Sequence, residues 1–215
     1  EKCGKFDVVV ANNVFAHIDD LTSVFEGITT VLEPDGCLIF ESQYLVDLIE
    51  SGAFDMIYHE HLDYHTLGPL KPFLWRFGLV MTGWEHIPTH GGSIRVTAHK
   101  MGEECETPEE ALDWDGLRAK IEEARARVHA AIGSGRIQAF GASAKATTLI
   151  AELDLQDRIE FVVDDTPQKQ FRYIPGTDIP VYPVAQLKDG PVLLTAWNYE
   201  KEIAQRIPNR LINPF

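Results

Sequence analysis

The hydrophobic pattern of the first part of the chain predicts a strand–helix–strand unit. The run Phe6–Ala11 is short, apolar and rich in valine, which is typical of a strand buried in a parallel sheet. Apolar residues then recur at helical spacing over residues 19–32, with Asp19 or Asp20 as the candidate N-cap. Pro34-Asp35-Gly36 predicts a turn into a second buried strand, Cys37–Glu41. This order favours a right-handed parallel crossover.

The pattern changes after this unit. Residues 42–78 have an interrupted helical pattern, and the runs Leu79–His86 and Ser93–His99 predict two strands, paired antiparallel. Met101–Thr107 is polar and acidic and has no periodicity, so it is the predicted link between two domains.

The sequence therefore predicts a first domain at residues 1–104 and a second at residues 105–215. The second opens with a long amphipathic helix, Pro108–Ile132, for which Thr107 is the expected cap. Strands and helices then alternate, which predicts a mostly parallel sheet. These elements are strand Ile137–Gly141, helix Ala144–Leu153, strand Ile159–Asp164, short strand Ile179–Val181, strand Val192–Trp197 and helix Tyr199–Ile207.

Composition narrows the class of protein. Hydrophobic residues make up 45% of the chain, enough for a buried core, and no apolar run approaches the roughly 20 residues of a membrane span. The formal net charge of −14 argues against a nucleic-acid or anionic-membrane surface, but not against a small anionic ligand. The three cysteines, Cys3, Cys37 and Cys105, have no metal-site or disulfide spacing. We expect a reduced, soluble, cytoplasmic protein.

The loop that follows the first strand is one candidate site. It contains Asn12, Asn13 and His17, and ligands of open parallel sheets bind beyond the carboxyl ends of strands. The loop either lines a cofactor cleft or only caps the next helix.

The second candidate is the stretch Phe54–His61, which is rich in ionisable residues. It could be a surface turn, or a metal site that uses His59, His61 and His65, although H-E-x-x-H fails at Asp63. An acid–base cluster fits better, because a histidine oriented by a carboxylate can remove a proton beside a ketone. A tyrosine hydroxyl can then donate to the enolate oxygen.

Two glycine-containing stretches complete the candidates. In His90–Arg95, two glycines either form a simple turn or let backbone amides approach a ligand. In Phe140–Lys145, a strand ends and a helix begins, and the N-terminus of such a helix can bind an anion. Asp164 and Asp165 follow at the distance of a ribose-binding acid, so an NAD(P)-dependent oxidoreductase remains an alternative even though G-x-G-x-x-G is absent.

Several motifs resemble those of known methyltransferases. D-V-V-V-x-N-x-V-x-x-H (7–17) and L-x-P-D-G-x-L-I-F-E (32–41) resemble the fourth and fifth strands of class I S-adenosylmethionine-dependent methyltransferases. E-S-Q-Y-L (41–45), F-D-M-I-Y-H-E-H (54–61) and P-T-H-G-G-S-I-R (88–95) resemble sugar C-methyltransferases acting on nucleotide-linked keto-deoxysugars. G-A-S-A-K, V-V-D-D-T-P-Q-K-Q and I-P-G-T-D-I-P-V resemble the C-terminal Rossmann-like domain of the same family.

The resemblance implies a role for each matching residue. His61 would be the base, Glu60 would orient it or bind the sugar, and Tyr58 would steady the enolate. Asn12, Asn13 and His17 would contact S-adenosylmethionine. Contacts to the nucleotide sugar would come from Gln43, Tyr44, His59, His90, Gly91, Gly92, Ser93, Arg95, Ser143 and Lys145, with Lys169 and Arg172 as further diphosphate candidates.

The resemblance also predicts an α/β fold, with an incomplete class I methyltransferase domain followed by a second Rossmann-like domain. The family pattern begins before Phe6, so we expect an N-terminally truncated, largely inactive form of a SAM-dependent C-methyltransferase of deoxysugar biosynthesis. The partner would be a dTDP-linked sugar, with neither nucleic acid nor membrane involved. A non-catalytic sugar-nucleotide binding module is the other alternative. The sugar, the methylated carbon and the oligomeric state are not indicated.

Overall fold

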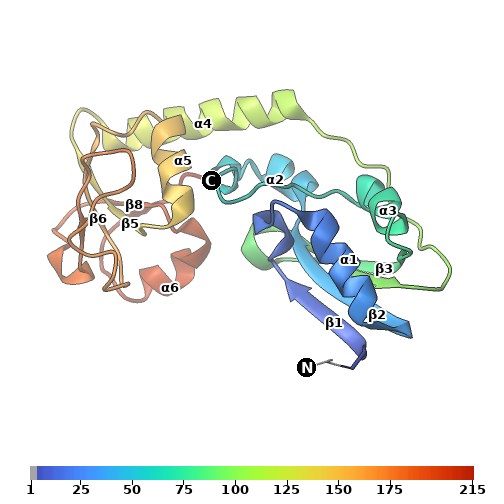
Figure 1. Cartoon of the computed structure of the whole chain (residues 1–215). Coiled ribbons are helices and arrows are strands. Elements are labelled where there is room, and N and C mark those ends of the chain that lie inside the picture. Colours follow the sequence, from blue (N-terminus) through green and yellow to red (C-terminus); the bar gives the residue numbers. More distant parts are fainter. Residues whose placement is uncertain (1–3) are drawn as a thin grey trace. The chain divides into compact units, whose positions relative to one another are not determined.

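The computed structural model of the chain describes residues 4–215. Residues 1–3, among them Cys3, lie outside the described residues, as does the side chain of the predicted site residue His90. The chain forms two compact units, one made of residues 1–49 and 59–112 and the other of residues 50–58 and 113–215. Figure 1 shows that each unit combines helices with a sheet, so the predicted α/β class is confirmed.

The first unit is built on a four-stranded sheet with the order β1-β2-β4-β3. The parallel pair β1–β2 and the antiparallel pair β3–β4 confirm the predicted pairings, and β4 also lies antiparallel beside β2. Helix α1 lies along β1 and β2 (Figure 1), and Asp20 is its N-cap, because its Oδ1 accepts from the Ser23 amide at 3.0 Å. The elements are β1 (Phe6–Asn12), α1 (Leu21–Val31), β2 (Leu32–Gln43), α2 (Leu45–Ser51), α3 (Leu67–Trp75), β3 (Val80–Ile87) and β4 (Ser93–His99).

The turn predicted at Pro34–Gly36 is instead an irregularity inside β2. Leu32 already pairs with Phe6, and the register then shifts so that Val8 lies opposite Cys37. The intervening residues bulge without leaving the strand. A Cβ on Gly36 would lie 3.0 Å from the carbonyl oxygen of Phe6, so glycine lets the bulge pass close to β1.

Helices α1 and α3 bury the apolar face of this sheet. Phe25 from α1 and Leu74 from α3 join Leu38, Phe40 and Ile94 from the strands in one core, and each is almost wholly buried. Burying a side chain of this size stabilises the fold by about 1.5–3 kcal/mol. The core therefore fixes the carboxyl ends of β1 and β2, where the candidate loops begin.

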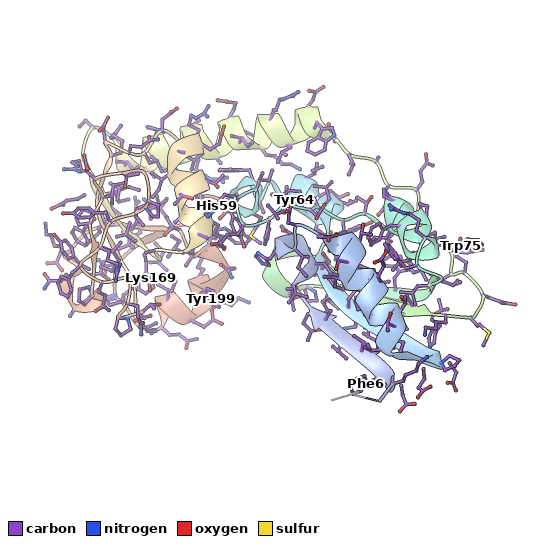
Figure 2. All side chains as sticks on the ribbon, in the orientation of Figure 1. Phe6, His59, Tyr64, Trp75, Lys169 and Tyr199 are labelled. Carbon is purple, nitrogen blue, oxygen red and sulfur yellow. The ribbon has the colours of Figure 1, made fainter. Side chains whose placement is uncertain are left out.

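The β1 strand, at the edge of this sheet, has one covered and one open face. Val9 and Ala11 pack against the core, whereas the alternate residues Phe6, Val8 and Val10 are exposed. Figure 2 labels Phe6 near the start of this strand.

The second unit contains a five-stranded sheet with the order β7-β6-β5-β8-β9, in which every pairing is parallel, as predicted. Its elements are α4 (Trp114–Ile132), β5 (Ile137–Phe140), α5 (Ala144–Glu152), β6 (Ile159–Val163), β7 (Val181–Tyr182), β8 (Val192–Leu194), α6 (Glu200–Ala204) and β9 (Leu211–Ile212).

The last strand and the last helix predicted in this unit are shorter in the structure. The strand beginning at Val192 ends at Leu194, because the hydroxyl of the next residue, Thr195, donates to the Phe140 carbonyl at 2.7 Å and the chain then turns. A 3-10 turn at Trp197–Tyr199 precedes α6, so the predicted helix is reduced to Glu200–Ala204. Strand β9 has no counterpart among the predicted elements.

Helix α4 begins at Trp114, six residues later than predicted, and its N-cap is Asp113 rather than Thr107. The Asp113 carboxylate accepts from the Gly116 amide at 2.8 Å. The preceding residues belong to the first unit, where Glu110 accepts hydrogen bonds from the Tyr44 hydroxyl and the Leu67 amide. The units therefore divide after Leu112 rather than after residue 104, and the second unit also takes residues 50–58.

Candidate functional site

The loop after β1 and the ionisable motif meet in the first unit. Nδ1 of His17 lies 2.9 Å from the backbone oxygen of Glu60, and the rings of His17 and His61 lie 4.9 Å apart, edge to face. The Leu62 amide also donates to the Ala16 oxygen at 2.7 Å. Because a carbonyl oxygen only accepts, Nδ1 of His17 carries the proton in this contact. The predicted base thus lies beside the predicted cofactor loop.

The cofactor loop turns sharply at the carboxyl end of β1. Asn13 has a φ of 51°, and its amide donates to the Glu41 oxygen at 2.9 Å, which anchors the loop to β2. The side chain of Asn12 is exposed and that of Asn13 half-buried. Side-chain amides at this edge of a parallel sheet can pair with the hydroxyls and ring nitrogens of a nucleoside. These residues fit one side of an S-adenosylmethionine site.

The remaining motif residues differ in exposure. Tyr58 and His61 are half-buried, whereas His59 and Glu60 are exposed, and Figure 2 labels His59. Nε2 of His59 lies 3.8 Å from Oε1 of Glu60, and an exposed contact of this length contributes little free energy. In the chain, Tyr58 is the last residue of the segment assigned to the second unit, and His59 returns to the first.

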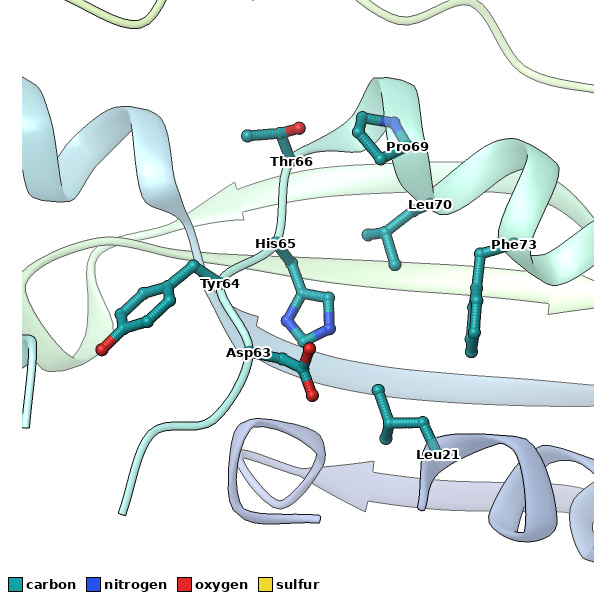
Figure 3. A pocket seen from close by; sticks show the side chains of 8 residues that line it. All are labelled: Leu21, Asp63, Tyr64, His65, Thr66, Pro69, Leu70 and Phe73. Atoms are coloured by element: carbon teal, nitrogen blue, oxygen red, sulfur yellow. The ribbon is translucent and has the colours of Figure 1, made fainter. Parts of the chain in front are cut away.

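A small cavity follows the motif (Figure 3). Its volume is about 220 Å³, and the side chains of Asp63 and His65 line it together with Leu21, Leu70 and Phe73. Sites for drug-sized ligands usually measure about 300–1,000 Å³, so this cavity is too small for a whole nucleotide sugar.

His65 in this cavity is held by the sheet. Its Nδ1 lies 2.7 Å from the Ser42 hydroxyl, and burial lowers its pKa while Asp63 opposes that change. The ring is therefore neutral near pH 7. Among residues 4–215, no three His, Cys, Asp or Glu side chains are grouped to hold a metal ion.

The strand ends bring several predicted substrate residues together. Gln43 pairs with Ser93 across β2 and β4, and the Tyr44 amide donates to the Gly92 oxygen at 3.3 Å. Ser93 is wholly buried, and its hydroxyl donates to the Thr89 oxygen. Gln43 differs from Ser93, because its Oε1 is buried with no hydrogen-bond partner among the described residues. Gln43 is thus the member of this group best suited to accept from a ligand.

Arg95 is already paired with two carboxylates. Its Nε and Nη2 donate to Oε1 of Glu41 at 2.9 and 2.5 Å, and its Nη1 donates to Glu85 at 2.7 Å. These hydrogen bonds raise the pKa of Arg95 above its ordinary value. An anionic ligand would have to compete with both acids for this guanidinium.

The glycine pair before β4 accommodates a neighbouring side chain. Gly91 has a φ of 86° and Gly92 a φ of 118°. A Cβ on Gly92 would collide with the Asp47 carboxylate, which is paired with Nε2 of His86 at 2.5 Å. Gly92 is therefore needed for the approach of Asp47.

In the second unit, Ser143 and Lys145 lie at the start of α5. Ser143 is the N-cap residue, and its buried Oγ has no hydrogen-bond partner in the described part of the chain. Lys145 donates to Oδ1 of Asn198 at 2.7 Å, and its Nζ lies 4.4 Å from the centre of the Trp197 ring. Burial lowers the pKa of Lys145, although Asp55 opposes that change.

Asp164 has a structural role that the dinucleotide alternative does not anticipate. Its Oδ2 accepts from the Ala142 amide at 2.7 Å and its Oδ1 from the Thr166 amide at 2.8 Å, while Lys169 lies 3.4 Å from Oδ2. Burial raises the pKa of Asp164, but the contacts from Thr166, Ala142 and Lys169 outweigh it, and the pKa is lowered. The carboxylate binds the turn before α5, where a dinucleotide-binding acid would face a ribose. Arg172, the remaining diphosphate candidate, is exposed.

Sequence reasoning did not single out Asp55 or Trp197. Asp55 is wholly buried, and its Oδ2 accepts from the Trp197 indole at 2.7 Å. Asp55 stands inside the quoted motif, but nothing in its local pattern indicates burial. Its partner is 142 positions away in the chain.

Comparison with known proteins shows similarity to methyltransferases in both parts of the chain. A family model described as a methyltransferase domain matches residues 1–82, and one described as the C-methyltransferase C-terminal domain matches residues 114–211. C-methyltransferase NovU from Streptomyces niveus is 33% identical over 224 residues, covering 91% of this chain and 52% of the relative. The chain thus spans about half the length of that curated relative.

The solved structures that match include the following two. N-methyltransferase NodS from Bradyrhizobium japonicum WM9 is 13% identical, covers 46% of this chain and 52% of its own, and has a TM-score of 0.33. M1.HpyAVI is 12% identical, covers 75% and 80%, and has a TM-score of 0.26.

The chain has an α/β fold and is similar to methyltransferases over both matched stretches. The relative NovU and the second matched family model are both C-methyltransferases, the class that the motifs of this chain resemble. Among the described residues, no helix is both long and apolar enough to span a membrane.

Proposed function

We propose that this protein acts in the C-methylation, by S-adenosylmethionine, of a nucleotide-linked keto-deoxysugar. The observation that carries the proposal is the position of His61, whose ring lies 4.9 Å from that of His17 on the cofactor loop. A base that acts on carbon must lie close to the incoming methyl group, because the carbanion formed has to react before it is reprotonated. The similarity to C-methyltransferases supports the same reaction class.

In the proposed reaction, the chain's own residues take the roles that the resemblance implies. His61 accepts the proton of the carbon next to the ketone, and the electron pair of the broken C–H bond moves into the carbonyl to give an enolate. Tyr58 donates a hydrogen bond to the enolate oxygen, and Glu60 orients the base or binds the sugar. S-adenosylmethionine, when bound, supplies a methyl group already activated by the sulfonium charge. Asn12, Asn13 and His17 are the residues here that would contact it.

Two unpaired polar atoms support a nucleotide sugar as substrate. Oε1 of Gln43 is a buried acceptor suited to a sugar hydroxyl. Oγ of Ser143 lies at the N-terminus of α5, where backbone amides favour an anion such as a diphosphate. Lys145 adds a cation next to Ser143.

The test is deuterium exchange. The chain is incubated in heavy water with a dTDP-linked 4-keto-deoxysugar, and loss of the proton next to the ketone is followed by NMR. We expect exchange that disappears in His61→Ala and persists in His129→Ala, whose ring instead contacts the Leu153 oxygen in the second unit. Binding of the sugar nucleotide without exchange would favour a non-catalytic binding module. Exchange retained in His61→Ala would remove His61 from the role of base.

A further inference from the structure

The segment Glu50–Tyr58 is held in the second unit, although residues of the first unit precede and follow it in the chain. The Lys120 ammonium donates to the Glu50 oxygen at 2.6 Å, and the Thr148 hydroxyl donates to the Ile57 oxygen at 3.1 Å. Residues 52–56 between these contacts are buried. Apolar packing and two hydrogen bonds to backbone oxygens would thus already hold the segment to the unit.

A buried carboxylate in such a segment is unexpected. Asp55 has no exposed surface, and its Oδ1 finds no hydrogen-bond partner within residues 4–215. Its Oδ2 accepts from Trp197 at 2.7 Å and lies 3.9 Å from Nζ of Lys145. Burying a carboxylate is costly, and replacement of such a group by an apolar one is often neutral or stabilising. Stability alone therefore does not explain why an acid occupies this position.

The carboxylate adds a directional contact at the short 3-10 turn Phe54–Met56 itself, whereas the two hydrogen bonds to backbone oxygens lie on either side of it. Apolar contacts are non-directional, so they alone would not fix the rotation of this turn. An indole N–H bonded to Oδ2 fixes both the rotation and the register of that turn. The ammonium of Lys145 lies over the ring of Trp197 and 3.9 Å from Oδ2 of Asp55, which favours this position of the ring. Tyr58 follows Asp55 by three residues, so the position of its backbone depends on the position of this turn.

We propose that Asp55 is a positioning residue, which uses its hydrogen bond from Trp197 to fix the chain that carries Tyr58. This proposal rests on the proposed function, in which Tyr58 donates to the enolate oxygen. Asp55 itself has no exposed surface through which it could contact a ligand.

Three variants separate the contributions. Asp55→Leu removes the acceptor and keeps the branched shape of the side chain, Asp55→Asn keeps an acceptor oxygen, and Trp197→Phe removes the N–H donor together with one ring of the indole. Glu50→Gln is the matched control, because Glu50 is exposed on the same segment and its backbone oxygen, not its carboxylate, contacts Lys120.

The first readout is amide hydrogen exchange of residues 53–58, which does not depend on activity. We expect exchange at least about tenfold faster in Asp55→Leu and Trp197→Phe than in the wild type and Glu50→Gln, with Asp55→Asn in between. The indole N–H resonance assigned through Trp197→Phe should move in Asp55→Leu. Unchanged protection in Trp197→Phe would overturn the proposal, even if Asp55→Leu does not fold.

The second readout is the rate of proton exchange in the sugar nucleotide. We expect the turnover rate to fall about tenfold in Trp197→Phe and the KM to change little, with partial recovery in Asp55→Asn relative to Asp55→Leu. Unchanged turnover in Trp197→Phe would also overturn the proposal. No proton exchange in the wild type would instead count against the proposed function, and amide protection would still decide whether Asp55 fixes the segment.

Discussion

The His17 ring meets the His61 ring edge to face, with 4.9 Å between their centres and 65° between their planes. His17 is fixed in turn by the Glu60 backbone oxygen, 2.9 Å from its Nδ1. One histidine thus joins the loop after β1 to the backbone of the motif. Because the contact goes to the main chain, it restrains where His61 points without using the side chain of Glu60.

We predict that His17→Phe lowers the rate of substrate proton exchange by about tenfold, because a ring remains beside His61 but the hydrogen bond to the Glu60 oxygen is lost. The KM for the sugar nucleotide should change little. His129→Phe is the matched control, since it removes a contact of the same kind to the Leu153 oxygen in the second unit. Equal rates in the two variants would show that His17 does not restrain the motif.

A second prediction concerns pH and Asp55. Burial raises the pKa of this carboxyl from 3.8 to about 6, although Lys145 and Trp197 oppose the change. The folded protein therefore holds the proton more tightly than the unfolded chain. The contribution of Asp55 to the free energy of unfolding is therefore complete below pH 3.8 and is lost as the pH rises through about 6. This pH-dependent contribution is on the order of 3 kcal/mol.

The measurement is the free energy of unfolding in denaturant, compared between the wild type and Asp55→Asn at several pH values. We expect the free energy of unfolding of Asp55→Asn to rise relative to that of the wild type as the pH increases from about 4 to about 7. For Asp165→Asn the difference should instead shift in favour of the wild type as the pH rises through 3.8, because hydrogen bonds from Arg206 lower the pKa of Asp165 in the folded protein below that value. A difference that stays constant with pH would mean that Asp55 does not titrate in this range.

The spacing of apolar residues predicts most of the helices and strands, because interactions between residues close in the chain determine them. The valine-rich β1 and the periodic α1 are predictable, since each buries a face that its own sequence defines. The start of α4 is not predictable in this way. Glu110, which precedes the helix, accepts hydrogen bonds from residues at least 42 positions away in the first unit.

The candidate site shows the same division. The motif around His61 is visible in the sequence because its residue types carry the chemistry. Its contact with His17 depends on a fold that brings together residues 44 positions apart. The burial of Asp55 against Trp197 spans 142 positions, and no pattern near Asp55 signals it.

A third prediction concerns Glu110, which connects three groups of the first unit. Its carboxylate accepts from the Tyr44 hydroxyl at 2.9 Å and from the amides of Leu67 and Gly68, at the first turn of α3, at 2.6 and 2.8 Å. Glu110→Ala should lower the free energy of unfolding by about 2 kcal/mol, because α3 loses its capping carboxylate and Tyr44 its acceptor. Glu109→Ala, an exposed neighbour, is the control, and an equal loss in both variants would contradict this role.

The last prediction separates two reasons for a glycine. Gly92 and Gly78 have φ values of 118° and 71°, but a Cβ would collide with Asp47 only at Gly92, since nothing lies within 4 Å of one at Gly78. Gly78→Ala should therefore cost about 1 kcal/mol from backbone strain alone. Gly92→Ala should cost about 3 kcal/mol, because Asp47 must also move away from His86. Unfolding in denaturant measures the loss of stability in both variants. Equal losses would mean that Asp47 moves aside without cost and that backbone conformation alone requires a glycine at position 92.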